Sequence, residues 1–568
     1  MAFDGITLKA ISYELKNLIG YKIDKVYEPT KNEILLGLYG NYSKLALNIC
    51  IDSKFYRTHL TTNCKANPNK SPNFCMLLRK NIIGYKIKDI VTNGLERVLI
   101  LKLEPFDSKE RNSKSLIIEL MGKHSNIILT DNNNIIIDSM RHTNLENNSY
   151  RNIFPKQQYI FPKSDKLNIY DVNSFDEFYA IIAPELQVRS VSEAISNKFT
   201  GISLSHIEFF INNLGHINES NKDDIKKLFI FLKNVLVSLE NSNVAFKEIK
   251  NKNDYGLIIT PNTSAKFDLN FFIDDFYFQK EVHSDFISYR NSILKLILDT
   301  LKRYKKRLAN IDAKLEECSN MDTYKLYGEL LTANLYKLTD KHLESVTLSN
   351  YYTSEDIIVP LDKKLNPNEN AKQYFKKYNK LKNALLVVEK QKKETVAEIN
   401  YIESIVYELE NSTTIDEVQI IFEEISENVI FKNKLDNLNK KKIKKKNNKV
   451  KKDTFNPLSF EFNGYTILIG RNNKENDLIT TKYASSTDLW FHAKGIPGSH
   501  VVLKANGAAD IEDKILIKCA RFAALHSKAK NSSNIPVDYC QIKYVKKPNG
   551  AKPGMVIYTH NKTLYINT

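Results

Sequence analysis

The sequence predicts an α+β protein of several domains, in which a long antiparallel pair of helices separates two compact parts. The chain has 568 residues, which is more than one hydrophobic core usually serves, so roughly three to five units of ordinary domain size are expected. Short apolar runs typical of strands fill residues 1–162 and return after residue 453, and a regular heptad pattern lies between them.

The expected domain boundaries follow these changes of pattern. In chain order the predicted parts are an α+β domain at 1–172, a helical region at 173–240, a strand-rich return segment at 241–284, a helical arm with a small tip at 285–432, a lysine-rich linker at 433–452 and a compact α+β domain at 453–568.

The first domain is predicted to be a largely antiparallel sheet with two helices. Its strand-like runs lie between turn residues, at 34–38, 45–51, 98–103, 116–120, 127–129 and 135–137. Apolar residues recur with helical spacing at 8–19 and 73–82. Polar residues that punctuate the runs are candidates for a nucleic-acid platform, although a solvated sheet face has the same pattern. The candidates on this face are Arg57, Glu96, Arg97, Lys123 and His124.

A short turn, FTGIS at 199–203, leads into a predicted helix and resembles the hairpin of a helix-hairpin-helix unit. Backbone amides at such a helix start could receive a phosphate, but any Gly-x-Ser before a helix also gives an ordinary N-cap. Residues 241–282 return to strand-like runs, at 255–260 and 271–278, and are expected to close back on the first domain.

Two heptad seams predict a helical arm. The first seam consists of Ile297, Leu301, Tyr304, Leu308, Ile311 and Leu315. The second consists of Tyr374, Tyr378, Leu381, Leu385 and Val388, is interrupted at Lys392 and Thr395, and resumes at Ile399, Ile402, Val406 and Leu409. A helical stretch at 327–338 and a strand-like excursion at 344–362 lie between them, which favours an intramolecular coiled-coil hairpin over a dimeric coil.

About 35 residues per helix give the arm a length of roughly 50 Å. A rigid spacer or a dimerisation rod is the alternative interpretation of the same pattern. After the arm, residues 439–452 contain nine lysines in fourteen residues, which predicts a flexible, self-repelling linker that touches phosphates nonspecifically.

The C-terminal domain holds the densest group of unusual residues, including the only tryptophan of the chain. The candidates for RNA or ribosome contact are Arg471, Asn472, Asn473, Asp488, Trp490, His492, Lys494 and His500. Aromatic faces beside basic side chains suit RNA, and the alternative is that Trp490 and Phe491 belong to the core. Two histidines eight residues apart match no usual metal spacing and no nucleophile is evident, so no catalytic residue, metal or cofactor is expected.

Composition points to a basic protein of a reducing compartment. The chain carries 83 Lys and Arg against 66 Asp and Glu, a formal charge of +17, which favours polyanionic partners unless AT-rich coding alone raised the lysine content. Its six cysteines form no CxxC pair. Neither a secretory signal nor an apolar run long enough for a membrane span is present, so a cytoplasmic protein is expected.

Several strings distributed along the chain resemble one family, the ribosome quality control factors called RqcH in bacteria and NEMF in animals, which are NFACT proteins also described as fibronectin-binding protein A-like. These strings are FCMLLRK, MGKHSNIIL, GELLTANLY, NAKQYFKKYNKLK, GRNN, DLWFHAKGIPGSHVV, VDYC and KKPNGAKPGMVIY. The resemblance implies an NFACT-N domain with a formamidopyrimidine-glycosylase-like fold, a helix-hairpin-helix unit, a coiled-coil arm and an NFACT-R domain.

The resemblance also implies a function. Members of the family bind a large (50S) ribosomal subunit obstructed by peptidyl-tRNA and recruit alanyl-tRNA, so that the subunit adds a C-terminal alanine tail that marks the product for degradation. A small S4-type RNA-binding accessory protein would fit beside them. The Asp-Arg pair with which the family binds tRNA matches Glu96-Arg97, where this sequence has Glu in place of Asp.

The chain is therefore expected to be a binding protein and not an enzyme. A nucleic-acid-modifying enzyme on the glycosylase-like fold is one alternative, but the chain begins Met-Ala-Phe-Asp and lacks the N-terminal Pro-Glu pair of those enzymes. A surface adhesin for fibronectin is the other alternative, and it lacks an export signal.

Overall fold

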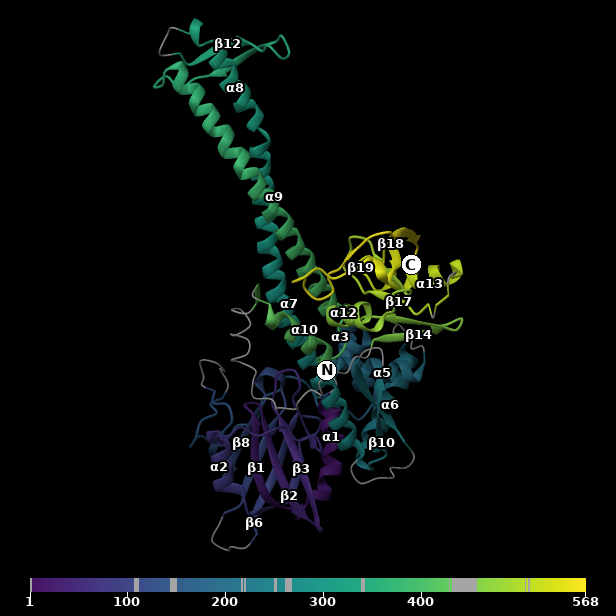
Figure 1. The fold of residues 1–568 in the computed structure, drawn as a ribbon. Coiled ribbons are helices and arrows are strands. Elements are labelled where there is room, and N and C mark those ends of the chain that lie inside the picture. The colour runs from purple at the N-terminus through teal and green to yellow at the C-terminus, as the bar shows by residue number, and fades with distance from the viewer. Residues whose placement is uncertain are drawn as a thin grey trace. The chain divides into compact units, whose positions relative to one another are not determined.

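The computed structural model describes residues 3–106, 112–143, 151–215, 218, 221–249, 253–260, 268–338, 343–428, 430–431, 457–505, 507–508 and 511–568. Contacts divide the chain into two compact units, Met1–Ser284 and Asp285–Thr568, each with its own hydrophobic core (Figure 1). Both units mix helices and strands, as the sequence predicts. The predicted lysine-rich linker at 433–452 lies wholly outside the described residues.

A nine-stranded antiparallel sheet forms the centre of the first unit (Figure 1). Its strands are β1 (Lys22–Thr30), β2 (Glu33–Gly40), β3 (Ser43–Cys50), β4 (Arg57–Leu60), β5 (Tyr85–Thr92), β6 (Val98–Pro105), β7 (Lys114–Glu119), β8 (Asn126–Asp131) and β9 (Ile136–Ser139). They are arranged in the order β4-β3-β2-β1-β5-β6-β7-β8-β9.

All six predicted strand runs fall on strands of this sheet, which confirms the sequence prediction there. Helix α2 (Asn73–Ile82) has the predicted bounds, and α1 (Gly5–Leu15) covers most of the other predicted helix. Strands β1, β4 and β5 were not predicted. Strands β1 and β5 carry charged residues at exposed or half-exposed positions, so the apolar alternation that indicates a strand is incomplete. Strand β4 is short, and its four buried residues include the polar Arg57 and His59.

Four helices and a hairpin complete the first unit. They are α3 (Phe175–Leu186), α4 (Val191–Lys198), α5 (Leu204–Leu214), α6 (Lys222–Glu240), β10 (Val244–Ile249) and β11 (Asp254–Ile259). Their apolar faces share one core with α1 and one face of the sheet. The opposite face of β6–β9 buries a second, smaller cluster beneath residues 151–161. Strands buried on both faces have continuous apolar runs, which is why β6–β8 were easy to predict.

Helix α7 (Asp268–Ser319) begins inside the first unit, which corrects the prediction of a strand at 271–278. Leu269, Ile273, Phe276 and Tyr277 are buried at intervals that place them on one side of a helix. At its first turn, the backbone N–H groups of Leu269 and Asn270 donate to the Glu14 carboxylate at 2.9 and 3.0 Å. The aromatic-rich run at 271–278 predicts a strand, but the burial of its residues follows a helical period.

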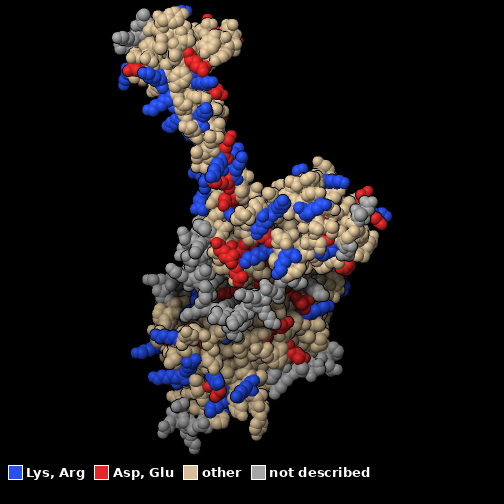
Figure 2. All heavy atoms as spheres, viewed as in Figure 1, with Lys and Arg blue, Asp and Glu red and all other residues tan. Residues whose placement is uncertain are grey.

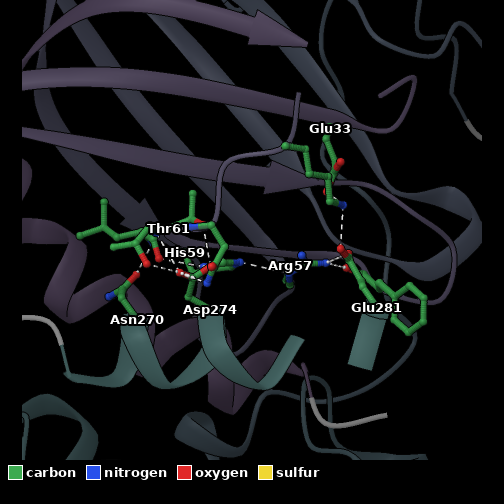
Figure 3. Close-up of polar contacts among 12 residues, drawn as sticks. Glu33, Arg57, His59, Thr61, Asn270, Asp274 and Glu281 are labelled. Atoms are coloured by element: carbon green, nitrogen blue, oxygen red, sulfur yellow. Dashed lines mark hydrogen bonds and ion pairs between the residues drawn. The ribbon is translucent and has the colours of Figure 1, made fainter. Parts of the chain in front are cut away.

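Buried polar contacts attach the start of α7 to edge strand β4 and the loop that follows it (Figure 3). The Asp274 carboxylate accepts hydrogen bonds from the hydroxyl of Thr61 at 2.5 Å and the backbone N–H of Thr62 at 2.8 Å. Two turns further along α7, Glu281 forms ion pairs with Arg57 at 2.8 Å and Lys65 at 2.7 Å. These contacts pack residues 268–284 onto the first domain, as the sequence predicts for the return segment.

His59 completes this network as a neutral ring. Burial, together with the charge of Arg57, lowers the pKa of His59 to about 4. Its Nε2 accepts a hydrogen bond from Arg57 at 3.0 Å, and its Nδ1 lies 2.9 Å from the carbonyl oxygen of Leu60. The Nδ1–H tautomer satisfies both contacts, so the ring orients the guanidinium toward Glu281.

In the second unit, α7 runs antiparallel to α9 (Pro367–Asn411). Every residue of the two predicted seams is buried or half-buried. Ion pairs fix the register, with Lys305 2.7 Å from Glu403 and Lys392 2.8 Å from Asp312. Figure 2 accordingly shows basic and acidic side chains next to each other along the arm. The tip consists of α8 (Met321–Ala333), β12 (Ser345–Ser349) and β13 (Asp356–Pro360).

The C-terminal domain contains a six-stranded antiparallel sheet in the order β14-β15-β17-β16-β18-β21. The strands are β14 (Leu458–Phe462), β15 (Tyr465–Ile469), β16 (Leu489–Ala493), β17 (Val501–Leu503), β18 (Ile535–Gln541) and β21 (Lys562–Ile566). Helix α13 (Asp513–Leu525) covers one face. Helix α12 (Asn473–Leu478), the π-helical turn Ile479–Tyr483 and a short ribbon of β19 (Val545–Lys546) and β20 (Ile557–Tyr558) lie at the other. No described helix of either unit is long and apolar enough to cross a membrane.

Two buried glutamates lie where α9 meets α10 (Ile415–Glu427). Glu408 is on α9 and Glu424 is on α10, where it accepts a hydrogen bond from the Tyr401 hydroxyl at 2.9 Å. Burial and the neighbouring carboxyl raise the pKa of Glu408 well above its usual range, and burial raises the pKa of Glu424 to about 7. The pair is therefore at least partly protonated near neutral pH.

We predict that Glu281→Ala lowers the free energy of unfolding by about 3 kcal/mol, because the buried Arg57 loses its counter-charge. Urea denaturation of the full chain measures this. A matched control is Glu104→Ala, which removes a carboxylate paired with exposed lysines on the same sheet and should cost below about 1 kcal/mol. Equal losses in the two variants would contradict the role given to the network.

The buried glutamates predict a pH dependence. An unfolded glutamate ionises near pH 4.3, whereas folded Glu424 holds its proton until about pH 7. The contribution of Glu424 to the free energy of unfolding is therefore fully present below about pH 4. It is lost progressively, by up to about 3 kcal/mol, as the pH rises to 7. Glu424→Gln should flatten this decrease in the thermal unfolding midpoint, and exposed Glu410→Gln should not. A wild-type slope retained in Glu424→Gln would contradict the assignment.

Candidate RNA-binding surfaces

Four of the five candidates in the first unit lie in turns at one end of the sheet, and not on the strand face that alternation predicts for them. Glu96 and Arg97 are in the turn between β5 and β6, and Lys123 and His124 are in the turn between β7 and β8. Alternate turns of an antiparallel meander lie at the same end, and the backbone N–H of Leu120 bonds the Arg97 carbonyl at 2.9 Å. We call the two turns, 93–97 and 121–125, together with the loop 51–56, the loop rim.

The turn that carries Glu96 and Arg97 is fixed by close backbone packing. A Cβ added to Gly5 or Gly201 would lie 1.8 or 1.9 Å from the carbonyl oxygen of Leu95, so only glycine fits at either position. Gly201 also has a φ of +71°, which other residues rarely adopt. The start of α1 and the turn before α5 therefore hold the residue that precedes Glu96 in place.

Arg97 has the properties of an anion-binding side chain. It is half-buried, and its Nη1 lies 3.4 Å from the Tyr56 hydroxyl, with the guanidinium 6.0 Å from the Tyr56 ring. Among the described residues no ion pair neutralises it. Burial and then the nearby Arg97 charge lower the pKa of Lys166, so two cations share this part of the surface. Uncompensated positive charge beside an aromatic ring suits a nucleic-acid phosphate or base edge.

Lys123 and His124 are exposed in the second turn of the loop rim. Arg141 supports them from behind, because its guanidinium donates to the carbonyl oxygens of Lys123 at 3.3 Å, Ser125 at 3.0 Å and Ile51 at 2.9 Å. Three loops are thereby tied together. The rim thus presents its cations from a preorganised backbone, which lowers the entropic cost of binding.

Arg57 is a correction to the candidate list. It is only 3% exposed and is occupied by Glu281, by the Phe55 carbonyl at 2.8 Å and by the face of the Tyr277 ring at 4.8 Å. An incoming RNA cannot reach it without unfolding this region. Its strand is at the sheet edge where α7 packs, so the side chain that alternation assigned to solvent is covered by a distant segment.

The turn at 199–203 does not offer its amides to a ligand. Ser203 caps α5 with its side chain, and its backbone N–H donates to the Asp4 carboxylate at 2.9 Å. Asp4 also contacts His206 Nδ1 at 2.7 Å. Although burial raises the pKa of Asp4, His206 and the hydrogen bonds outweigh it and hold that pKa below its usual value. The chain's own carboxylate thus takes the position of a phosphate, and the ordinary N-cap is the correct alternative.

Most of the C-terminal candidates are buried and already have partners. The buried candidates are Asn472, Asn473, Asp488, Trp490 and His500. Trp490 packs among Ile479, Val502 and Cys540, so the core alternative is correct for this tryptophan. Asp488 accepts hydrogen bonds from Lys504 at 2.8 Å and from the backbone of Ala505 at 2.9 Å. These side chains shape the domain and cannot meet RNA directly.

The GRNN motif docks the C-terminal domain on the base of the arm. Asn473 donates to the Ser404 hydroxyl at 3.1 Å and to Glu424 at 3.3 Å. Arg471 forms ion pairs with Glu475 at 2.8 Å and Glu417 at 3.5 Å. Its charge is therefore compensated inside the unit, which removes Arg471 from the group of free cations.

The two histidine candidates of this domain, His492 and His500, are neutral and so offer no positive charge to a phosphate. Burial lowers the pKa of His492 to about 4, and burial with the neighbouring His492 lowers that of His500 well below its usual value. His500 Nδ1 contacts the Thr480 hydroxyl at 2.8 Å. Lys494 is exposed, with its Nζ 3.7 Å from the buried carboxylate of Asp538. Of the eight candidates, Lys494 alone is an exposed basic residue.

Metal-type ligands come together once in the described residues, where Glu33, Cys50 and Glu281 lie within 4.8 Å of one another. Lys65 and Arg57 already form ion pairs with these carboxylates. Burial raises the pKa of the Cys50 thiol to about 12, so it is not a thiolate. Two cations in place and a protonated thiol make a poor metal site.

Comparison with known proteins gives the family. A model of the NFACT N-terminal and middle domains matches residues 4–446, and a model of the NFACT protein RNA binding domain matches residues 454–559. The chain belongs to the NFACT family. It is 33% identical to the Rqc2 homolog RqcH of Bacillus subtilis, over 100% of this chain and 98% of that protein. The Rqc2 homolog RqcH of Streptococcus suis is 32% identical over the same shares.

A solved structure of the N-terminal part of the fibronectin/fibrinogen-binding protein from Streptococcus suis is also similar. It is 28% identical, covers 49% of this NFACT chain and 100% of that one, and has a TM-score of 0.39. A likeness of shape this low carries no argument for fibronectin binding here. The model of the NFACT protein RNA binding domain instead matches the C-terminal domain, in agreement with the basic composition.

Proposed function

We propose that this NFACT protein acts in ribosome quality control, where it binds large (50S) ribosomal subunits obstructed by peptidyl-tRNA and recruits alanyl-tRNA. The subunit's own peptidyl transferase would then extend the stalled chain with C-terminal alanine, which marks it for degradation. In this proposal the protein positions RNA and performs no chemistry itself. The full-length similarity to two Rqc2 homologs RqcH and the RNA-binding domain support the proposal.

The loop rim is the observation that carries the tRNA part of the proposal. It combines a cation without a counter-ion, an adjacent tyrosine ring and two exposed basic residues on a stiff backbone. We assign Arg97 to tRNA phosphates or base edges, and Glu96 to base amino groups or ribose hydroxyls. Lys123 and His124 would contact neighbouring phosphates.

We predict that Arg97→Ala weakens tRNA binding by about 10- to 100-fold, since hydrogen bonds to a charged group contribute roughly 1.5–3 kcal/mol. Subunit association should change little, because the rest of the basic surface is intact. Fluorescence anisotropy with tRNA and co-sedimentation with 50S subunits measure the two quantities. Lys102→Ala, which removes an exposed charge on β6, is the matched control. Equal loss of tRNA and subunit binding by Arg97→Ala would refute this division.

A reconstituted reaction tests the proposed activity. Purified protein, alanyl-tRNA and 50S subunits carrying peptidyl-tRNA should together give products lengthened by alanine, detected by mass spectrometry. Omitting the subunits should abolish the reaction, because the peptide bond is made there. Products lengthened without subunits, or with every aminoacyl-tRNA equally, would contradict the proposal.

A further inference from the structure

The last thirty residues of the chain carry charge of a single sign. Residues 539–568 contain no Asp or Glu and five lysines, which are Lys543, Lys546, Lys547, Lys552 and Lys562. Two of them have partners, because Lys547 pairs with Asp477 and Lys552 pairs with Glu398. Lys543, Lys546 and Lys562 are exposed and form no ion pair with any described residue. A phosphate chain would find three uncompensated cations here.

The β19–β20 ribbon presents part of this segment on a firm base. Val545 pairs with Tyr558 and Lys546 pairs with Ile557. Tyr558 packs on Trp490 with ring centroids 4.8 Å apart, and its hydroxyl donates to the buried Asp538 at 2.8 Å. The next pair lies on the other side of the ribbon, where Ile557 is 60% exposed beside Lys546. The buried aromatics therefore support an exposed basic face.

Two aromatic rings stack at the end of this ribbon. The ring centroids of Tyr544 and His560 are 4.3 Å apart with an angle of 25° between the planes, and Lys543 Nζ lies 5.0 Å from the Tyr544 ring. His560 is exposed and has a φ of +56°, a backbone conformation that non-glycine residues seldom adopt. This unusual backbone conformation thus keeps the imidazole ring of His560 exposed to solvent.

We infer that the C-terminal domain binds unpaired RNA at the β19–β20 ribbon and the residues that flank it, with Lys543, Tyr544, Lys546, His560 and Lys562 as the contacting side chains. A base stacks on the outer face of the His560–Tyr544 pair while the three lysines contact the flanking phosphates. A stacked base must be splayed from its helix, so loops or single strands are the ligand and duplex RNA is not. The inference rests on the proposed function and gives it a surface in this domain.

The test uses the full-length protein and a labelled, unstructured RNA of about ten nucleotides, close to the length that one small single-strand-binding domain covers. Fluorescence anisotropy in moderate salt should show that His560→Asn weakens binding about tenfold or more. Asparagine tolerates the positive φ, so this substitution removes the ring and spares the backbone. Tyr544→Phe retains a stacking plate and should bind as the wild type does, and Lys543→Ala should weaken binding and reduce the salt dependence.

Two controls lie in the same domain. Tyr565→Ala removes an aromatic ring that is 66% exposed on β21, and Lys514→Ala removes an exposed charge on α13, which covers the opposite face of the sheet. Both variants should bind the RNA normally. An unchanged thermal midpoint shows that each variant is folded, and crosslinking of the bound RNA to residues 543–562 provides a measurement that does not depend on any variant.

The outcomes separate this inference from the proposed function. If the wild type binds the RNA and 50S subunits but His560→Asn binds the RNA equally well, the ribbon assignment is overturned and the proposed function stands. Equal affinity of the wild type for duplex and single-stranded RNA overturns the stacking assignment as well. If the wild type binds neither tRNA nor subunits, the proposed function fails, whatever the ribbon binds.

Discussion

The buried polar network between β4 and the first turns of α7 is the constraint on which the first unit depends. Glu281 and Asp274 lie on α7, and their partners lie on the sheet edge and the loop after it. Removing one partner from such a network leaves a buried charge without compensation, which costs far more than the pair itself contributes. Residues 268–284 are thereby part of the first unit, although the helix continues to Ser319.

This network also decides which basic residues are available for binding. Arg57 and Arg97 both punctuate apolar runs, but Arg57 is enclosed by Glu281 and Tyr277, and Arg97 lies at the loop rim without a counter-ion among the described residues. The C-terminal domain divides its cations in the same way. Arg471, Lys547 and Lys552 form internal ion pairs, whereas Lys543, Lys546 and Lys562 form none with any described residue. A formal charge of +17 is therefore spread over structural and functional groups with different roles.

Close packing also positions the residues that support the proposed binding surfaces. Gly5 and Gly201 allow two segments to approach Leu95, and Asp4 fills the helix terminus that otherwise attracts anions. The segment that resembles a phosphate-binding hairpin thus supports the Glu96–Arg97 turn in place of binding a ligand. Trp490 has a comparable role beneath the ribbon, where it supports Tyr558. In both units, a turn or side chain that the sequence offers as a binding candidate instead packs beneath the proposed binding surface and supports it.

The sequence by itself determined the mixed helix and sheet architecture, the six apolar strand runs of the first domain's sheet and the two long helices. Each of these depends on local periodicity or on the order of turns, and both are written in neighbouring residues. Burial of Arg57, Asp488, Trp490 and His500, the helical start of α7 and the Tyr544–His560 stack were decided only by tertiary structure. They depend on partners distant in the chain, such as Glu281 for Arg57. A local sequence pattern does not show which distant groups come into contact.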